Sequence, residues 1–155
     1  MQSEQNGTIT CLQEIYKNTC DGAGAIAAIL PRVEDEQLQK DLEQELHALR
    51  GIQMRAGRSL GALGETPKGP NPIQRAGMKL GIAMRTMRRT DSGHIAKLMV
   101  HGNEMGINEL RRTVATYPSL DGDARALADE LLQLELSSQQ TMQRYVTARP
   151  DARRE

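Results

Sequence analysis

Apolar and small residues recur at three- and four-residue spacing in four segments of this chain, residues 10–30, 35–60, 91–115 and 122–146. In the first segment these residues are Leu12, Ile15, Tyr16, Thr19, Ala23, Ile26 and Leu30. The spacing matches the 3.6-residue turn of an α-helix and places the apolar residues on one face. The pattern therefore predicts four amphipathic helices.

Residues that favour helix ends border these segments. Thr10 fits a capping box at the start of the first helix, and Pro31 ends that helix because the residue before a proline avoids the α conformation. Asp35 is the expected N-cap of the second helix. Asp91 or Ser92 would cap the third helix.

The connections between the predicted helices differ in length. Short turns join the first two and the last two helices, which makes each pair antiparallel. The middle connection, residues 61–90, is long enough to travel the length of the bundle and makes helices two and three parallel. We therefore predict an all-α, single-domain, ferritin-like four-helix bundle with up-down-down-up connectivity. Residues 1–8 and 148–155 are expected to be disordered.

This crossover has an unusual charge. Residues 61–72 are rich in Gly and Pro and indicate a linker, whereas residues 73–87 can form a short amphipathic helix. Residues 66–90 contain no acidic residue and carry a charge of +6, so the rest of this neutral chain carries −6. The six cations are Lys68, Arg75, Lys79, Arg85, Arg88 and Arg89.

Two interpretations of the basic crossover follow. Its apolar stripe can dock on the bundle while its cations pair with the acidic bundle surface. Alternatively, residues 68–89 bind an anionic membrane surface or nucleic acid, although Met78 and Ile82 interrupt the basic face. The chain has no Phe or Trp and three Tyr, so the aromatic platforms that stack nucleic-acid bases are scarce and nucleic acid is the less favoured partner.

The remaining composition bears on the core and on the compartment. Without Phe or Trp, the core must be filled by Leu, Ile, Ala and the eight methionines. Cys11 and Cys20 are nine residues apart, too far along a helix to form a disulfide, which favours reduced thiols in a cytoplasm. No signal-peptide pattern and no 18-residue apolar stretch is found, so we expect a cytoplasmic protein with no transmembrane segment.

Three stretches are similar to one known family. They are Ser92-Gly-His-Ile-Ala-Lys-Leu-Met-Val-His-Gly-Asn-Glu-Met-Gly-Ile-Asn108, Leu30-Pro-Arg-Val-Glu-Asp35 and Gly77-Met-Lys-Leu-Gly81. They resemble a family of small bacterial proteins of unknown function with a ferritin-like bundle. The resemblance spans nearly the whole chain. It implies the bundle architecture, but it implies no activity, and it assigns no role to any residue.

A ferritin-type di-iron site uses one Glu from each of two helices and a Glu-x-x-His pair from each of the other two. The three histidines here, His47, His94 and His101, are preceded three positions earlier by Gln44, Asp91 and Leu98. No Glu-x-x-His pair is therefore present. On a helical wheel His47 lies opposite its apolar face.

The stripe formed by His94, His101 and Glu104 lies on the polar face of its helix and is interpreted as solvated surface. Its spacing is poor for zinc.

The acidic residues leave a reduced metal site as an alternative. On the wheel Glu45 lies inside an apolar face, whereas Glu135 and Glu109 lie near the margins of theirs. Glu14 and Asp21 point away from the apolar stripe of the first helix. In the predicted bundle Glu45 and Glu135 lie at similar depth, and Glu109 lies about two turns away.

These carboxylates admit two interpretations. Glu45 and Glu135 can be partly buried carboxylates that bond to hydroxyls, amides or water. Alternatively, Glu45, Glu135 and Glu109 bind iron or manganese.

Two further patterns were weighed as catalytic sites. The run Gly57-Arg-Ser-Leu-Gly61 matches a nucleophile elbow, but no strand precedes it and a linker follows, so it is interpreted as a fraying helix end. Cys11 has no histidine near it in the sequence, and either cysteine is interpreted as a small buried residue.

The sequence leaves the enzyme question open and favours a non-catalytic cytoplasmic scaffold or interaction protein that binds a protein partner or self-associates, without a cofactor. The alternatives are the iron or manganese protein and the peripheral binder of an anionic surface.

Overall fold

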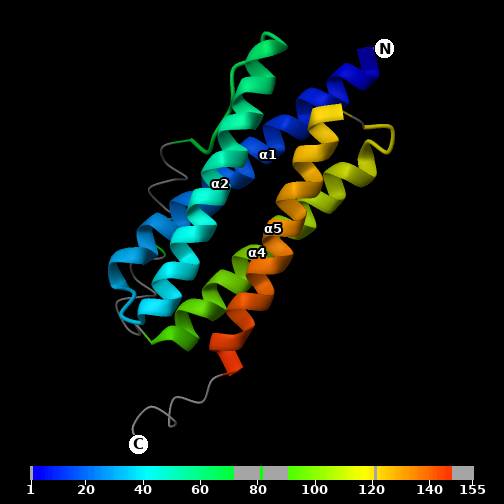
Figure 1. The fold of residues 1–155 in the computed structure, drawn as a ribbon. Helices are drawn as coiled ribbons and strands as arrows, with labels where there is room; N and C mark the ends of the chain where they lie inside the picture. The colour runs from blue at the N-terminus through cyan, green and yellow to red at the C-terminus, as the bar shows by residue number, and fades with distance from the viewer. Residues whose placement is uncertain (1, 72–80, 82–90, 121, 148–155) are drawn as a thin grey trace, which may run out of the picture.

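The computed structural model describes residues 2–71, 81, 91–120 and 122–147. Within this part of the chain there are four α-helices and no strand, which confirms the predicted all-α bundle (Figure 1). The helices are α1 (Gln2–Ile29), α2 (Glu36–Ala62), α4 (Ser92–Thr116) and α5 (Gly122–Thr147), with a short 3-10 turn at Leu30–Arg32. The predicted short helix at residues 73–87 lies outside the described residues.

The start of α1 corrects one prediction. The helix begins at Gln2, so residues 2–8 are helical rather than disordered and Thr10 lies inside the helix rather than at its cap. Tertiary packing explains the longer helix, because the ring of Tyr117 lies directly on Gly7. A Cβ atom at Gly7 would lie only 2.7 Å from that ring. The missing side chain therefore lets the first turns of α1 rest against the end of α4.

The predicted caps of α2 and α4 are confirmed. The Asp35 side chain accepts a hydrogen bond from the Leu38 backbone N–H at 2.9 Å. The Asp91 side chain accepts one from the His94 backbone N–H at 3.1 Å. Each bond satisfies one of the N–H groups that a helix start leaves without an intrahelical partner.

Side-chain contacts show how the α1–α2 and α4–α5 hairpins are paired. In the first hairpin the Gln53 amide of α2 donates to the Cys20 sulfur of α1. In the second, the Asn103 amide of α4 donates to the Ser138 hydroxyl of α5. Other close approaches follow the same order, with Gly22 near Leu49 in the first hairpin and Gly93 near Tyr145 in the second. In each hairpin one residue number rises as the other falls, so the paired helices are antiparallel.

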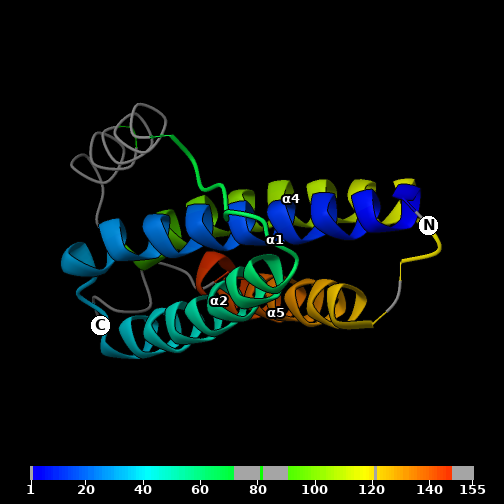
Figure 2. The ribbon, with the colours of Figure 1, turned by 90° about the horizontal axis from the view of Figure 1, so that it is seen from above.

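The two hairpins also contact each other through antiparallel neighbours, with α1 beside α4 and α2 beside α5 (Figure 2). Between α1 and α4, Gly7 meets Tyr117 and the Asn18 amide bonds to the Gly106 carbonyl. Between α2 and α5, the exposed Arg55 guanidinium makes a bidentate ion pair with Glu130. The long helices therefore enclose one common interior.

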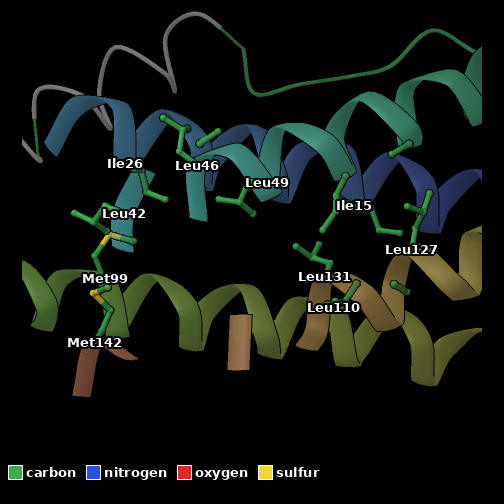
Figure 3. Packing of buried hydrophobic residues seen from close by; sticks show 14 of the residues in the cluster. Ile15, Ile26, Leu42, Leu46, Leu49, Met99, Leu110, Leu127, Leu131 and Met142 are labelled. Carbon is green, nitrogen blue, oxygen red and sulfur yellow. The ribbon is translucent and has the colours of Figure 1, made fainter. Parts of the chain in front are cut away.

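The apolar core falls into groups along the bundle (Figure 3). One group contains Ile26, Leu42, Met99 and Met142. Another contains Ile15, Leu110, Leu127 and Leu131. As predicted, Leu, Ile, Ala and Met fill this core. On α4 and α5, the inward positions between the two groups include the buried polar residues Asn103, Glu135 and Ser138, which belong to the candidate site.

Candidate functional site

A set of buried polar residues interrupts the apolar core at the middle of the bundle. It comprises Glu45 of α2, Asn103 of α4, and Glu135 and Ser138 of α5, each no more than 7% exposed. They occupy core positions of their helices: Glu135 and Ser138 follow Leu131 by four and seven residues. We call these four residues the polar layer.

Three members of the polar layer form a hydrogen-bonded chain across three helices. The Asn103 amide donates to the Ser138 hydroxyl at 3.1 Å, and that hydroxyl donates to Glu45 Oε2 at 2.6 Å. Burial raises the pKa of the Glu45 carboxyl, and the bond from Ser138 partly opposes this rise. This arrangement confirms that Glu45 lies in the core and has a hydroxyl as its partner.

Glu135 is placed differently from Glu45. Its carboxyl group lies on the α4 backbone at Gly106, where an added Cβ would be 2.6 Å from Oε2 and 2.7 Å from Oε1. A side chain at position 106 would therefore require the Glu135 carboxyl group to move away from α4. Glu135 Oε2 is buried and has no hydrogen-bond partner among the described residues.

The environment of Glu135 disfavours its charge. Burial raises the pKa of Glu135 to about 8, with further contributions from the negative charges of Glu45 and Glu109. At neutral pH the empty site therefore holds this carboxyl group mostly in its protonated form. A positive charge placed beside it would reverse that preference.

The predicted candidate Glu109 lies closer to this site than expected. It is three residues from Gly106, about one turn of α4 rather than two. Glu109 is half-buried and also approaches Glu14 of α1. Burial raises the pKa of Glu14, and the nearby Glu109 raises it further.

Glu14 and Asp21, which were predicted to point away from the apolar stripe of α1, are half-buried rather than exposed. Both lie close to α4: Glu14 approaches Glu109, and Asp21 lines the same space as Glu109. The helical wheel of α1 alone misses this contact, because α1 packs on α4 as well as on α2.

A cavity of about 450 Å³ opens beside the polar layer and is lined by described residues of α1, α2, α4, α5 and the segment after α2. The residues that line it include the carboxylates Glu45, Glu109 and Glu135. They also include the apolar residues Ile29, Leu49, Leu98 and Met99, which we call the apolar wall. We call this space the carboxylate cavity. Its volume is in the range of small-molecule sites.

The metal hypothesis receives limited geometric support. Glu45 and Glu135 are both buried and lie in the same region, as the sequence indicated. Among the described residues, however, no three His, Cys, Asp or Glu side chains are grouped so that they could hold a metal ion.

The histidines do not change this picture. His47 and His101 are exposed, as expected from the wheel, and so is Glu104. His94 is half-buried near the start of α4 rather than fully solvated.

The two candidate nucleophiles, Cys11 and Ser59, lie in surroundings that do not activate them. Burial raises the pKa of the Cys11 thiol to about 11, so it is not a thiolate at neutral pH. Ser59 and its flanking glycines lie within α2, which continues to Ala62, so they form no strand-to-helix turn.

Most of the basic residues that were predicted to bind an anionic surface lie outside the described residues. This applies to Arg75, Lys79, Arg85, Arg88 and Arg89. Lys68 is described; its side chain is exposed and its backbone N–H donates to the Gln13 side chain at 2.8 Å. Binding of an anionic surface through residues 68–89 stays a prediction.

Three polar residues of the site were not singled out from the sequence. Asn18, Asn103 and Ser138 are all buried. Asn103 follows Met99 by four residues, and Ser138 precedes Met142 by four. A polar side chain at a position that faces the core could have identified these residues from the sequence, because a buried amide or hydroxyl is normally hydrogen-bonded.

Comparison with known proteins identifies no relative. No family model matches the chain, and no curated protein or solved structure is detectably similar to it. Separately, none of the described helices combines the length and the apolar character needed to cross a bilayer.

Proposed function

We propose that this protein is a non-catalytic, ferritin-like helical bundle that acts by binding a positively charged ligand in the carboxylate cavity. One observation carries the proposal: Glu135 Oε2 is buried, has no partner among the described residues, and belongs to a residue that lines the cavity. Leaving a buried oxygen without a partner costs free energy, so a ligand that supplies the missing donor is stabilised there.

The electrostatics of the cavity favour a cation. Glu45, Glu109 and Glu135 line it together with Asp21, and its described lining also includes Lys17 and His101. Burial and mutual repulsion raise the pKa of Glu135. A bound positive charge relieves that repulsion, which stabilises the complex relative to the empty protein.

We also propose that the connectivity is the ferritin-like up-down-down-up arrangement. Four antiparallel contacts support it, namely α1 with α2, α2 with α5, α5 with α4, and α4 with α1. If each neighbouring pair is antiparallel, the diagonal pairs are parallel. The family resemblance of Ser92–Asn108 supports the same arrangement.

Thermal unfolding with a panel of cations tests the binding function. The panel contains Mn(II), Fe(II) under anaerobic conditions, methylammonium, n-hexylammonium and spermidine. We expect at least one cation to raise the Tm of the wild type and to leave the Tm of Glu135→Gln unchanged, because only a ligand of the folded state stabilises it. If no cation raises the Tm, or if every rise persists in the variant, the proposal is wrong.

The second candidate is a carboxylate-bridged iron or manganese site at Glu45, Glu135 and Glu109. The free Glu135 oxygen favours it, since hard oxygen ligands suit these metals. Elemental analysis of the purified protein, before and after incubation with Fe(II) and Mn(II), tests it directly. Stoichiometric metal that is lost in Glu45→Ala would support this candidate, and its absence from the wild type would reject it.

The cysteines and two exposed methionines bear on the compartment and the partners of the protein. Cys11 and Cys20 form no disulfide with each other, which suits a reducing cytoplasm. Met54 and Met105 are large apolar side chains that are more than half exposed, and they offer surface for a protein partner or for self-association. Measurement of the mass in solution tests self-association, and a mass of 17.1 kDa would indicate a monomer.

A further inference from the structure

The lining of the carboxylate cavity contains two chemically different kinds of side chain. Glu45, Glu109 and Glu135 are carboxylates, whereas Ile29, Leu49, Leu98 and Met99 are apolar. A ligand that contacts both kinds must join a compact positive charge to an apolar body. This requirement separates small organic cations from bare metal ions.

The carboxylates that line the cavity suit an ammonium group better than a metal ion. An ammonium group has three N–H donors and donates hydrogen bonds of about 2.8 Å to carboxylate oxygens. A divalent metal requires several oxygen atoms at about 2.0 to 2.6 Å in a fixed geometry. Within the described part of the chain no such grouping of acidic, histidine or cysteine side chains exists, and the cavity of about 450 Å³ is far larger than one ion.

We propose that the carboxylate cavity binds a primary alkylamine, with the ammonium group on Glu135 and the alkyl chain on the apolar wall. Glu135 Oε2 is the unpartnered acceptor, and Glu109 and Glu45 supply the neighbouring negative charges. The inference rests on the proposed binding function, since it names the ligand class of the same cavity.

Binding of an ammonium ion changes the protonation of Glu135. The other titratable residues that line the cavity are Lys17 and Asp21 of α1, Glu45 of α2, and His101 and Glu109 of α4. An ammonium ion that binds the charged carboxylate displaces the proton of Glu135 into solvent. Below about pH 8 the reaction therefore releases a proton.

Isothermal titration with n-hexylamine hydrochloride at pH 7 tests the inference. We expect one site per chain, with affinity at least about tenfold weaker in Glu135→Gln, because one hydrogen bond to a charged group is lost. The exposed Glu104→Gln is the matched control and should bind like the wild type. The measured heat should also differ between phosphate and Tris buffers, because a proton is released.

Two further comparisons test separately the contribution of the positive charge and the contribution of the alkyl chain to binding. The neutral n-hexanol should bind at least about tenfold more weakly than n-hexylamine, since it lacks the charge. Leu98→Ala should weaken n-hexylamine binding severalfold, because apolar contact with the chain is lost. If Glu135→Gln fails to fold by circular dichroism, the half-buried Glu109→Gln takes its place and should weaken binding severalfold.

The outcomes distinguish this inference from the binding function itself. If Mn(II) binds and is lost in Glu135→Gln while n-hexylamine does not bind, the amine inference is wrong and the cation-binding function stands. If no cation of the panel binds, both fail. Equal binding of n-hexylamine and n-hexanol, or unchanged amine affinity in Glu135→Gln, also overturns the inference.

Discussion

The apolar layer around Ile15, Leu110 and Leu131 differs sharply from the polar layer one to two turns away. The apolar layer is closed by aliphatic side chains that are at most 1% exposed. The polar layer is also buried, but it contains a hydrogen-bonded Glu45 and a Glu135 whose Oε2 has no partner among the described residues. The apolar layer stabilises the fold without a ligand. In the polar layer, burial of the unpartnered Glu135 oxygen costs free energy, and a ligand that donates a hydrogen bond to it removes that cost.

The largest expected difference between the layers is the pH dependence that Glu135 confers. Its pKa is about 8 in the folded protein against 4.5 for an ordinary Glu. Between these values the folded state holds a proton that the unfolded state has released, so stability falls as pH rises from 4.5 to 8 and is level above 8. The whole difference corresponds to about 5 kcal/mol.

Denaturant unfolding of the wild type and Glu135→Gln across pH 4.5–8.5 measures this effect. Gln cannot ionise, so the variant should gain about 5 kcal/mol relative to the wild type over this interval. Glu104→Gln, which changes an exposed carboxylate, should follow the wild type. A constant difference between wild type and Glu135→Gln would show that Glu135 ionises normally and would remove the contrast between the layers.

The apolar layer should respond to loss of volume and not to pH. Leu131 is fully buried, so Leu131→Ala should lower the free energy of unfolding by about 2 to 5 kcal/mol, through lost burial and the cavity that remains. Chemical denaturation at two pH values measures this loss. Met54→Ala, at a position more than half exposed on α2, should cost much less. A small effect of Leu131→Ala would mean that this layer is loosely packed.

The smallest expected effect tests the hydrogen-bonded chain within the polar layer. Ser138→Ala removes the donor to Glu45 Oε2 and should cost about 1 to 3 kcal/mol at neutral pH. The pKa of Glu45 should rise further, because the bond from Ser138 lowers it. Carbon-detected NMR of the carboxyl group measures that shift.

The neighbouring Ser137→Ala, on an exposed side of α5, is the matched control and should change neither quantity. An unchanged pKa of Glu45 in Ser138→Ala would indicate that water replaces the hydroxyl, and the layer would then be less closed than its burial suggests.

The ends of the later helices were predictable because their signals are local. Asp35 and Asp91 cap their helices through bonds to backbone groups three residues away. Pro31 and the Tyr117–Leu120 turn likewise act within a few residues. The start of α1 was not predictable in this way, because it depends on Tyr117 packing on Gly7 from a distant part of the chain.

The candidate site was predictable only in part. The position of Glu45 on an apolar face showed that it would be buried, and the common depth of Glu45 and Glu135 followed from the connectivity. The partners were not predictable, because Ser138 and Gly106 meet these carboxyl groups from other helices. The half-burial of Glu14 was not predictable for the same reason, since its neighbour Glu109 belongs to α4.

By itself the sequence determined the four amphipathic helices, the composition of the core and the absence of a Glu-x-x-His pair, since each depends on local spacing and residue type. Only the tertiary structure decided that the Glu135 carboxyl group rests on Gly106 beside a cavity, with no donor to its Oε2 among the described residues. Such a site depends on the angle and depth at which helices far apart in sequence pack, and hydrophobic spacing along one helix does not encode those quantities.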